Sequence, residues 1–193
     1  MQYKLNVPNA ITIFRILLVP VFLALMVAGE YGWALAAFAV AGVSDAVDGA
    51  VARMTGDITE FGAALDPIAD KTLALAAFVS LTALGAVPPW FTAIVVLRDA
   101  VIVAGNFAIH FKGIAFRIRP FTTGKAATFM QFTLIVSALH GLYCGPGGEG
   151  AACWRGVELT GLLIWPTLAL IVVSGVQYVL LGVSVAKGDK HDR

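Results

Sequence analysis

Four aspartates stand at two helix-like spacings in an otherwise strongly apolar sequence. Asp45 and Asp48 lie three residues apart at the end of one apolar stretch, and Asp66 and Asp70 lie four apart at the start of the next. Both spacings place the paired side chains on one face of an α-helix. Because the connection between the stretches is short, we expect antiparallel neighbouring helices whose four carboxylates face one another at one end.

Such a cluster of acids indicates a metal site. Uncompensated carboxylates in a medium of low dielectric are protonated or poorly tolerated. Mg²⁺ or Mn²⁺ would neutralise them, since both prefer hard oxygen ligands, and two ions about 4 Å apart suit displacement at phosphorus. Gly49 and Gly62 lack side chains and would let a ligand approach the backbone beside the acids. Arg53 follows Asp48 by about one turn and has the donor geometry to bind a phosphate.

The acids by themselves leave two other interpretations open. Carboxylates inside membrane segments also line the cation pathways of transport proteins, and they also form structural salt bridges. A pathway would distribute acids through the depth of the membrane, whereas these four gather at one end of their segments. The pattern therefore favours a metal–phosphate site in an enzyme over a transport protein.

The composition is that of a membrane protein. The 193 residues are 59% hydrophobic and 13% charged, with a mean hydropathy of +0.87, whereas soluble domains are about 25% charged. We expect an all-α, polytopic membrane protein formed by one domain, residues 1–193. The net charge of +1 gives no reason to expect a nucleic-acid partner.

Six segments approach the roughly 20 apolar residues that a transmembrane helix requires. They cover residues 8–28, 32–53, 62–84, 88–111, 122–143 and 158–184. The first could be mistaken for a signal peptide, but it has no small-residue cleavage site and is long enough to span a membrane. We therefore expect six transmembrane helices, the first of them retained.

Lysine and arginine gather on one side of the predicted spans. The side with both termini and the loops 54–61 and 112–121 carries Lys4, Arg53, Lys112, Arg117, Arg119, Lys125, Lys187, Lys190 and Arg193. The opposite loops carry only Arg155. This bias predicts cytoplasmic termini and aspartates at the cytoplasmic leaflet. The compact length and the absence of a transit peptide lead us to expect a bacterial inner membrane.

Eight residues around the acids match a known signature. The pattern D-x2-D-G-x2-A-R-x8-G-x3-D-x3-D is complete at Asp45, Asp48, Gly49, Ala52, Arg53, Gly62, Asp66 and Asp70. It resembles the signature of the CDP-alcohol phosphatidyltransferase family. Asn9, Thr12 and Arg15 match the N-x2-T-x2-R pattern that is common in its glycerol-lipid members. The length and the expected six-helix layout extend the resemblance to essentially the whole chain.

The resemblance implies a reaction and a role for each matching residue. Members of the family transfer the phosphatidyl group of a CDP-linked lipid, usually CDP-diacylglycerol, to an alcohol and release CMP. By this resemblance, two Mg²⁺ or Mn²⁺ ions would be held by Asp45, Asp48, Asp66 and Asp70. Asp70 would also take the proton from the acceptor hydroxyl. The CDP pocket would be formed by Thr12, Gly49, Ala52, Arg53, Thr59 and Gly62, with Arg53 on the diphosphate. The resemblance also implies that the protein forms a homodimer and contacts membrane lipids.

A phosphorylated acceptor requires a basic pocket, for which Arg98, Arg117, Arg119 and Lys125 are candidates. Arg98 precedes Asp99, so a local ion pair is the alternative for it, and the two loop arginines could instead anchor at lipid headgroups. Lys125 lies in "RPFTTGKAATFMQ". That segment resembles the P-x3-[GS]-K-x2-T-x2-Q region of phosphatidylglycerophosphate synthases and of cardiolipin synthases of this fold.

Two dipeptides favour one acceptor over the other. Arg98-Asp99 and Arg119-Pro120 are more typical of the cardiolipin synthase branch. We therefore expect phosphatidylglycerol as the acceptor, with glycerol 3-phosphate as the alternative and inositol phosphate or serine as less favoured choices.

The two cysteines, Cys144 and Cys153, lie in the predicted loop 144–157 on the non-cytoplasmic side. An oxidising periplasm would allow a disulfide between them, and two unpaired thiols are the alternative.

Overall fold

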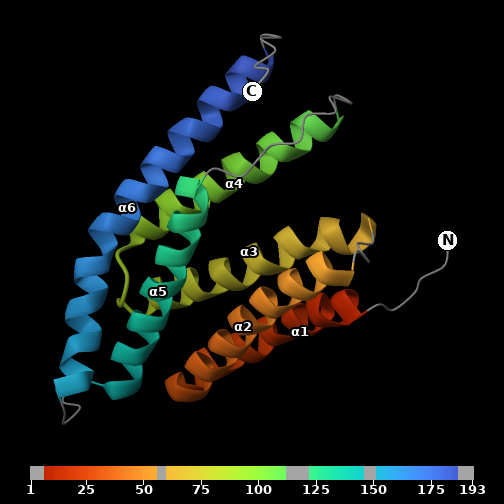
Figure 1. Ribbon diagram of the computed structural model, residues 1–193. Coiled ribbons are helices and arrows are strands. Elements are labelled where there is room, and N and C mark those ends of the chain that lie inside the picture. Colours follow the sequence, from red (N-terminus) through yellow and green to blue (C-terminus); the bar gives the residue numbers. More distant parts are fainter. Residues whose placement is uncertain (1–6, 56–59, 112–121, 146–150, 187–193) are drawn as a thin grey trace.

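The described part of the chain is entirely helical. The computed structural model describes residues 7–55, 60–111, 122–145 and 151–186, with side chains described over 14–44, 71–105, 122–145 and 158–182. Figure 1 shows the helices α1 (Val7–Ala28), α2 (Tyr31–Thr55), α3 (Glu60–Ala83), α4 (Pro89–Phe111), α5 (Thr122–Cys144) and α6 (Ala151–Ala186). They coincide closely with the six predicted segments, so the all-α class is confirmed.

Glycine ends α1 in a tight turn. The Gly29 N–H bonds to the carbonyl of Met26, and the Glu30 N–H bonds to the carbonyl of Leu25. This pair of bonds is a Schellman motif, which requires a left-handed residue directly after the helix. Gly29 has a φ of 76°, and Gly85 adopts a φ of 74° in the same motif after α3. Both helices therefore reverse into the next one through short connections.

The start of α6 differs from the prediction. We predicted a span from 158, but the helix begins at Ala151. The prediction followed apolarity, which is interrupted by Arg155 and Glu158. A helix is limited by its backbone hydrogen bonds rather than by apolarity, and polar residues do not end it. The predicted loop 144–157 is therefore shorter than expected.

The cysteine question has an answer in the structure. Cys144 is disulfide-bonded, and the sequence has one other cysteine, Cys153. Because Cys153 belongs to α6, the bond joins the end of α5 to the beginning of α6.

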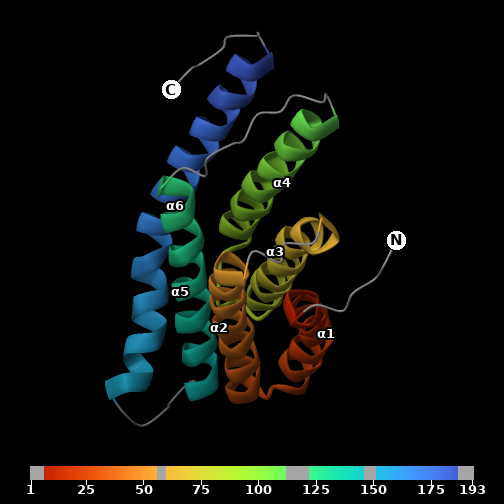
Figure 2. The same ribbon diagram turned by 45° about the vertical axis from the view of Figure 1, so that its right-hand side comes forward.

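The helices form two groups that meet along α5. Helix α1 packs against α2 and α3, and α5 lies along α6 while also contacting α2 and α3. Helix α4 packs against α6 and α3. Figures 1 and 2 show the start of α1, the end of α2 and the start of α3 pointing in the same direction, with the far ends of α4 and α6 diverging from them. The ends that carry the aspartates thus lie together at one end of the bundle.

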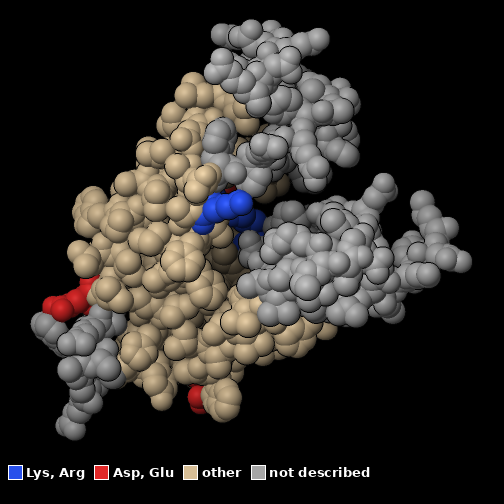
Figure 3. All heavy atoms as spheres, in the orientation of Figure 1, with Lys and Arg blue, Asp and Glu red and all other residues tan. Residues whose placement is uncertain are grey.

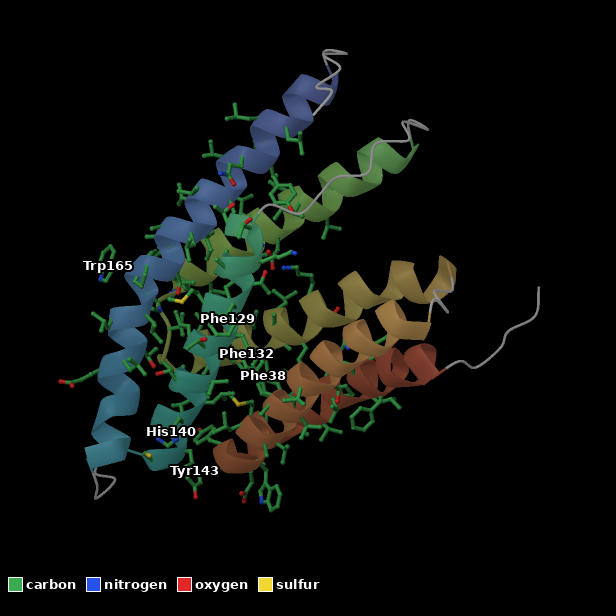
Figure 4. The ribbon with its side chains drawn as sticks, viewed as in Figure 1. Phe38, Phe129, Phe132, His140, Tyr143 and Trp165 are labelled. Atoms are coloured by element: carbon green, nitrogen blue, oxygen red, sulfur yellow. The ribbon has the colours of Figure 1, made fainter. Side chains whose placement is uncertain are left out.

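Aromatic rings join the two groups in the core. Phe38 of α2 stacks on Phe132 of α5 with their ring centroids 5.1 Å apart (Figure 4). Phe22 of α1 also contacts Phe38, with ring centroids 6.1 Å apart. Packing of this kind places α2 and α5 at a close, defined distance.

Large apolar side chains also cover the outside of the bundle. Exposed examples are Leu17, Val27, Leu97, Phe129, Leu162 and Trp165. An apolar exterior of this extent is typical of a surface that contacts lipid. Within the described residues, two helices, Thr122–Cys144 and Glu158–Gly182, are long and apolar enough to cross a membrane.

The close approach of α2 to α5 gives a first prediction. A Cβ atom on Gly42 would lie 2.3 Å from Cε2 of Phe132. Gly42→Val should therefore separate the helices and lower the free energy of unfolding by about 1–3 kcal/mol, as overpacking does. The midpoint of thermal unfolding in detergent micelles measures this loss.

Gly161→Val on α6 is the matched control, because a Cβ atom there meets nothing within 4 Å. Equal midpoints for the two variants would show that the Gly42 contact does not hold the helices together.

Candidate functional site

The aspartates occupy the joined ends of two helices. Asp45 and Asp48 lie in the second half of α2, and Asp66 and Asp70 in the first half of α3. Only residues 56–59 connect the two helices. The four acids therefore lie on consecutive helices, in the halves that residues 56–59 join.

Several predicted site residues lie beyond what the structure describes. The side chains of the four aspartates and of Thr12, Gly49, Ala52, Arg53 and Gly62 are outside the described side chains. Thr59, Arg117 and Arg119 are outside the described residues altogether. Among the side chains that are described, no three His, Cys, Asp or Glu residues gather as a metal site would require. The convergence of the four carboxylates on metal ions remains a prediction.

A chain of charged groups begins next to the acid motif. Lys71 directly follows Asp70, and its Nζ atom lies 3.0 Å from Oδ2 of Asp99 on α4. The other carboxylate oxygen of Asp99 accepts a hydrogen bond of 2.8 Å from Nη1 of Arg98. Arg98 then donates to Oγ of Ser174 on α6, from Nε at 3.2 Å and from Nη2 at 3.0 Å. This chain connects α3, α4 and α6.

Burial makes the charged chain important for stability. Arg98 is only 6% exposed, and an unpaired cation in that position would cost several kcal/mol. The ion pair with Asp99, which was the alternative interpretation of Arg98, is confirmed. Its predicted contact with an acceptor phosphate stays a prediction, and would use a guanidinium that is already held in place.

Lys125 lies close to the same region from α5. It is an exposed residue in the first turn of the helix. Its neighbour Gly124 is buried, and a Cβ atom there would lie 3.7 Å from Nη2 of Arg98 and 3.5 Å from the ring of Tyr178. The guanidinium of Arg98 therefore lies against the first turn of α5, the turn that also carries Lys125.

Figure 3 shows the lysine and arginine side chains that are visible on this face gathered in a hollow between the two groups of helices. Along the chain, the cation Lys71 directly follows Asp70 of the acid motif. Positive charge next to an acid-bearing end is suited to a substrate that carries both phosphate groups and bound cations.

A small cavity lies deeper in the bundle, between α1, α2, α3 and α5. Its volume is about 50 Å³, and its polar walls are formed by Arg15, Lys71, Thr128 and Gln131. Arg15 is 1% exposed and Gln131 is 4% exposed. The remaining walls are largely apolar, so the cavity combines a few polar groups with an otherwise dry surface.

The helical register places this cavity directly beneath the acid motif. Ala41 and Gly42 line the cavity from α2, and Leu73 and Ala74 line it from α3. Asp45 follows Ala41 by four residues and Asp70 precedes Ala74 by four. Residues four apart share a helix face one turn, about 5.4 Å, from each other. Asp45 and Asp70 thus belong to the faces that line the cavity, one turn nearer the end of the bundle.

Sequence reasoning missed part of this arrangement. It assigned no role to Lys71, Thr128 or Gln131. Thr128 and Gln131 were within the matched P-x3-[GS]-K-x2-T-x2-Q segment, but only its lysine was interpreted. The three-residue spacing of Lys125, Thr128 and Gln131 was the available signal, because it follows one side of a helix down from the predicted site.

The sequence was compared with protein families and curated proteins. The sequence profile described as CDP-alcohol phosphatidyltransferase matches residues 5–181. The probable phosphatidylglycerophosphate synthase of Mycobacterium tuberculosis is 35% identical over 182 residues, which cover 90% of this chain and 80% of that protein.

Cardiolipin synthases are also similar. The CMP-forming cardiolipin synthase of Homo sapiens is 30% identical over 69% of this chain and 50% of its own length. The corresponding protein of Streptomyces coelicolor is 38% identical over 51% of this chain and 48% of its own length. The relatives therefore carry the names of two related activities.

The charged chain gives the second prediction. Asp99→Asn would leave Lys71 and the buried Arg98 without their carboxylate. Because both cations are only partly screened by solvent, we expect the free energy of unfolding to fall by about 2–4 kcal/mol. The thermal midpoint in detergent, followed by tryptophan fluorescence, reports this change.

Glu158→Gln is the control, since it also changes an acid to an amide but at an exposed position on α6. A midpoint for Asp99→Asn equal to that of Glu158→Gln would contradict a stabilising role for the chain.

Proposed function

Because the chain belongs to the CDP-alcohol phosphatidyltransferase family, we propose that it transfers a phosphatidyl group from CDP-diacylglycerol to a glycerol-type alcohol. Its family and its named relatives identify it as an enzyme of phospholipid synthesis. The complete eight-residue signature between Asp45 and Asp70 is the observation that carries the proposal.

We favour phosphatidylglycerol as the acceptor, as in a cardiolipin synthase. The Arg98-Asp99 and Arg119-Pro120 pairs support this choice. The short side chain of Asp99 bridges Arg98 and Lys71, which gives a physical reason for an aspartate at this position. Glycerol 3-phosphate is the second candidate, because the relative that matches over 80% of its length is named a probable phosphatidylglycerophosphate synthase.

The reaction proposed for the site is a substitution at phosphorus. The oxygen of the acceptor hydroxyl forms a bond to the phosphorus of the phosphatidyl group, while the bond from that phosphorus to CMP breaks. Asp70 would take the hydroxyl proton as general base, and Arg53 would bind the diphosphate. Lys125, which is exposed and makes no ion pair with another described residue, is suited to bind the acceptor phosphate.

We further propose that the four aspartates hold two Mg²⁺ or Mn²⁺ ions. The donor set fits these metals, since it consists of carboxylate oxygens on two connected helices. The neighbouring cation Lys71 pairs with Asp99, so its charge is already balanced by another carboxylate. Bound ions would neutralise the diphosphate and stabilise CMP as leaving group.

The apolar exterior and the family support a membrane-associated protein. We propose that all six helices span the membrane, in a bacterial inner membrane with both termini in the cytoplasm, as the distribution of lysine and arginine favours. The acyl chains of the substrates would then stay in the bilayer while the cytidine reaches the cytosol. A homodimer remains a proposal by family resemblance.

An acceptor panel tests the proposed function. Purified protein with CDP-diacylglycerol should release CMP fastest with phosphatidylglycerol, more slowly with glycerol 3-phosphate, and little with inositol phosphate or serine. Separation of the lipid products identifies which alcohol was joined. Asp70→Asn provides the blank, and its turnover should fall at least about 100-fold, as for loss of a general base.

Rapid transfer to serine or inositol phosphate alone would overturn the proposed acceptor class. Turnover that is unchanged in Asp70→Asn would remove this residue from the reaction.

Metal removal gives a separate prediction. CMP release should disappear in excess EDTA and return when Mg²⁺ or Mn²⁺ is added back, because uncompensated carboxylates would repel the diphosphate. Ca²⁺ at the same concentration controls for a nonspecific ionic effect. Full activity without any divalent ion would contradict the metal site.

A further inference from the structure

The cavity beneath the aspartates contains an amide group without a partner. Gln131 is 4% exposed, and its Nε2 atom makes no hydrogen bond within the part of the chain that the structure describes. A buried donor without an acceptor costs about 1–3 kcal/mol. Such a group in a functional region indicates a bound molecule that supplies the missing acceptor.

Thr128, an exposed residue one turn away on the same helix, adds a complementary group to the cavity lining. Its Oγ1 atom donates a hydrogen bond of 3.2 Å to the carbonyl of Gly124. The hydroxyl proton is therefore used, and lone pairs of Oγ1 remain to accept a hydrogen bond. Arg15 and Lys71 also line the cavity, and Lys71 is already paired with Asp99. Gln131 and Thr128 add a donor and an acceptor to these groups.

This combination fits an alcohol hydroxyl, which both accepts and donates a hydrogen bond. A phosphate oxygen or an ester carbonyl only accepts, and would leave the lone pairs of Thr128 unused. The volume of about 50 Å³ holds a hydroxyl-bearing carbon or a few water molecules. It offers no room for an acyl chain.

The position of the cavity relates the hydroxyl to the acceptor. Gln131 lies six residues beyond Lys125 on α5, about 9 Å along the helix axis. On the faces of α2 and α3 that line the cavity, Asp45 and Asp70 follow one turn nearer the end of the bundle. A glycerol phosphate held at Lys125, with its reacting hydroxyl near Asp70, would extend its remaining hydroxyl toward the cavity.

We propose that the cavity formed by Thr128 and Gln131 binds the secondary hydroxyl of the acceptor glycerol, the one that does not react. This inference rests on the proposed function. Both candidate acceptors, phosphatidylglycerol and glycerol 3-phosphate, carry this hydroxyl beside the primary hydroxyl that receives the phosphatidyl group. Gln131 and Thr128 are then positioning residues that orient the acceptor and discriminate in favour of glycerol.

Acceptor analogues that lack the secondary hydroxyl test the proposal. The pairs are glycerol 3-phosphate with 3-hydroxypropyl phosphate, and phosphatidylglycerol with phosphatidyl-1,3-propanediol. For whichever pair the protein uses, kcat/KM should be about tenfold higher for the glycerol form, because an acceptor without the secondary hydroxyl leaves the buried Nε2 atom of Gln131 unpaired. Gln131→Leu should reduce that ratio to about one, with the KM for CDP-diacylglycerol unchanged.

Three further variants keep the test independent of folding. Thr128→Val should reduce the same ratio to about threefold or less, since it removes one of two hydrogen bonds. Ser137→Ala, which changes another buried polar residue of α5 outside the cavity, should retain the wild-type ratio. Thermal midpoints identify a variant that has lost its fold. Gln131→Asn is a conservative replacement, and it should retain part of the preference for the acceptor with the secondary hydroxyl.

The outcomes separate the two proposals. If the wild-type protein transfers to no glycerol acceptor, the proposed function fails and this inference fails with it. If the wild type transfers to glycerol acceptors but uses the analogues without the secondary hydroxyl equally well, only the cavity assignment is overturned. The same holds if Gln131→Leu and Thr128→Val both keep the wild-type ratio of kcat/KM values.

Discussion

A buried charge in an apolar bundle needs a partner, and this requirement organises the contacts between α3, α4 and α6. Lys71, Asp99, Arg98 and Ser174 form a continuous chain from α3 through α4 to α6. An unpaired buried charge is far more costly than an apolar replacement, so the chain restricts how these helices can pack. It also fixes the position of the Lys71 side chain, and Lys71 directly follows Asp70, the last acid of the motif. Structure at the candidate site and stability of the bundle therefore depend on the same contacts.

The helical register relates the candidate metal site to the small cavity. Helices α2, α3 and α5 each contribute a face to the lining of the small cavity. Because one turn separates Asp45 and Asp70 from the cavity walls, metal binding and acceptor binding would occupy successive levels of one site. Close packing, such as that of Gly42 against Phe132, holds the levels in register, so small shifts between helices would disturb both.

Enzymes that act on lipids at a membrane must place a polar reaction at the edge of an apolar medium. Here the signature acids belong to one end of the bundle, while the exterior exposes large apolar side chains such as Leu97 and Leu162. The disulfide of Cys144 lies at the far end, where α5 meets α6. The two ends therefore differ in chemistry, and the family's signature belongs to only one of them.

The sequence by itself determined the helices, the family and the helix ends that carry the acids. These follow from local properties, namely apolar length, glycine at turns and the spacing of Asp45 to Asp70. It misplaced the start of α6, because apolarity does not mark where backbone hydrogen bonding begins. Only the tertiary structure decided that Lys71 pairs with Asp99, 28 residues away, and Arg98 with Ser174, 76 residues away. The burial of Gln131 was decided in the same way, since a cavity between four helices exists only once they pack.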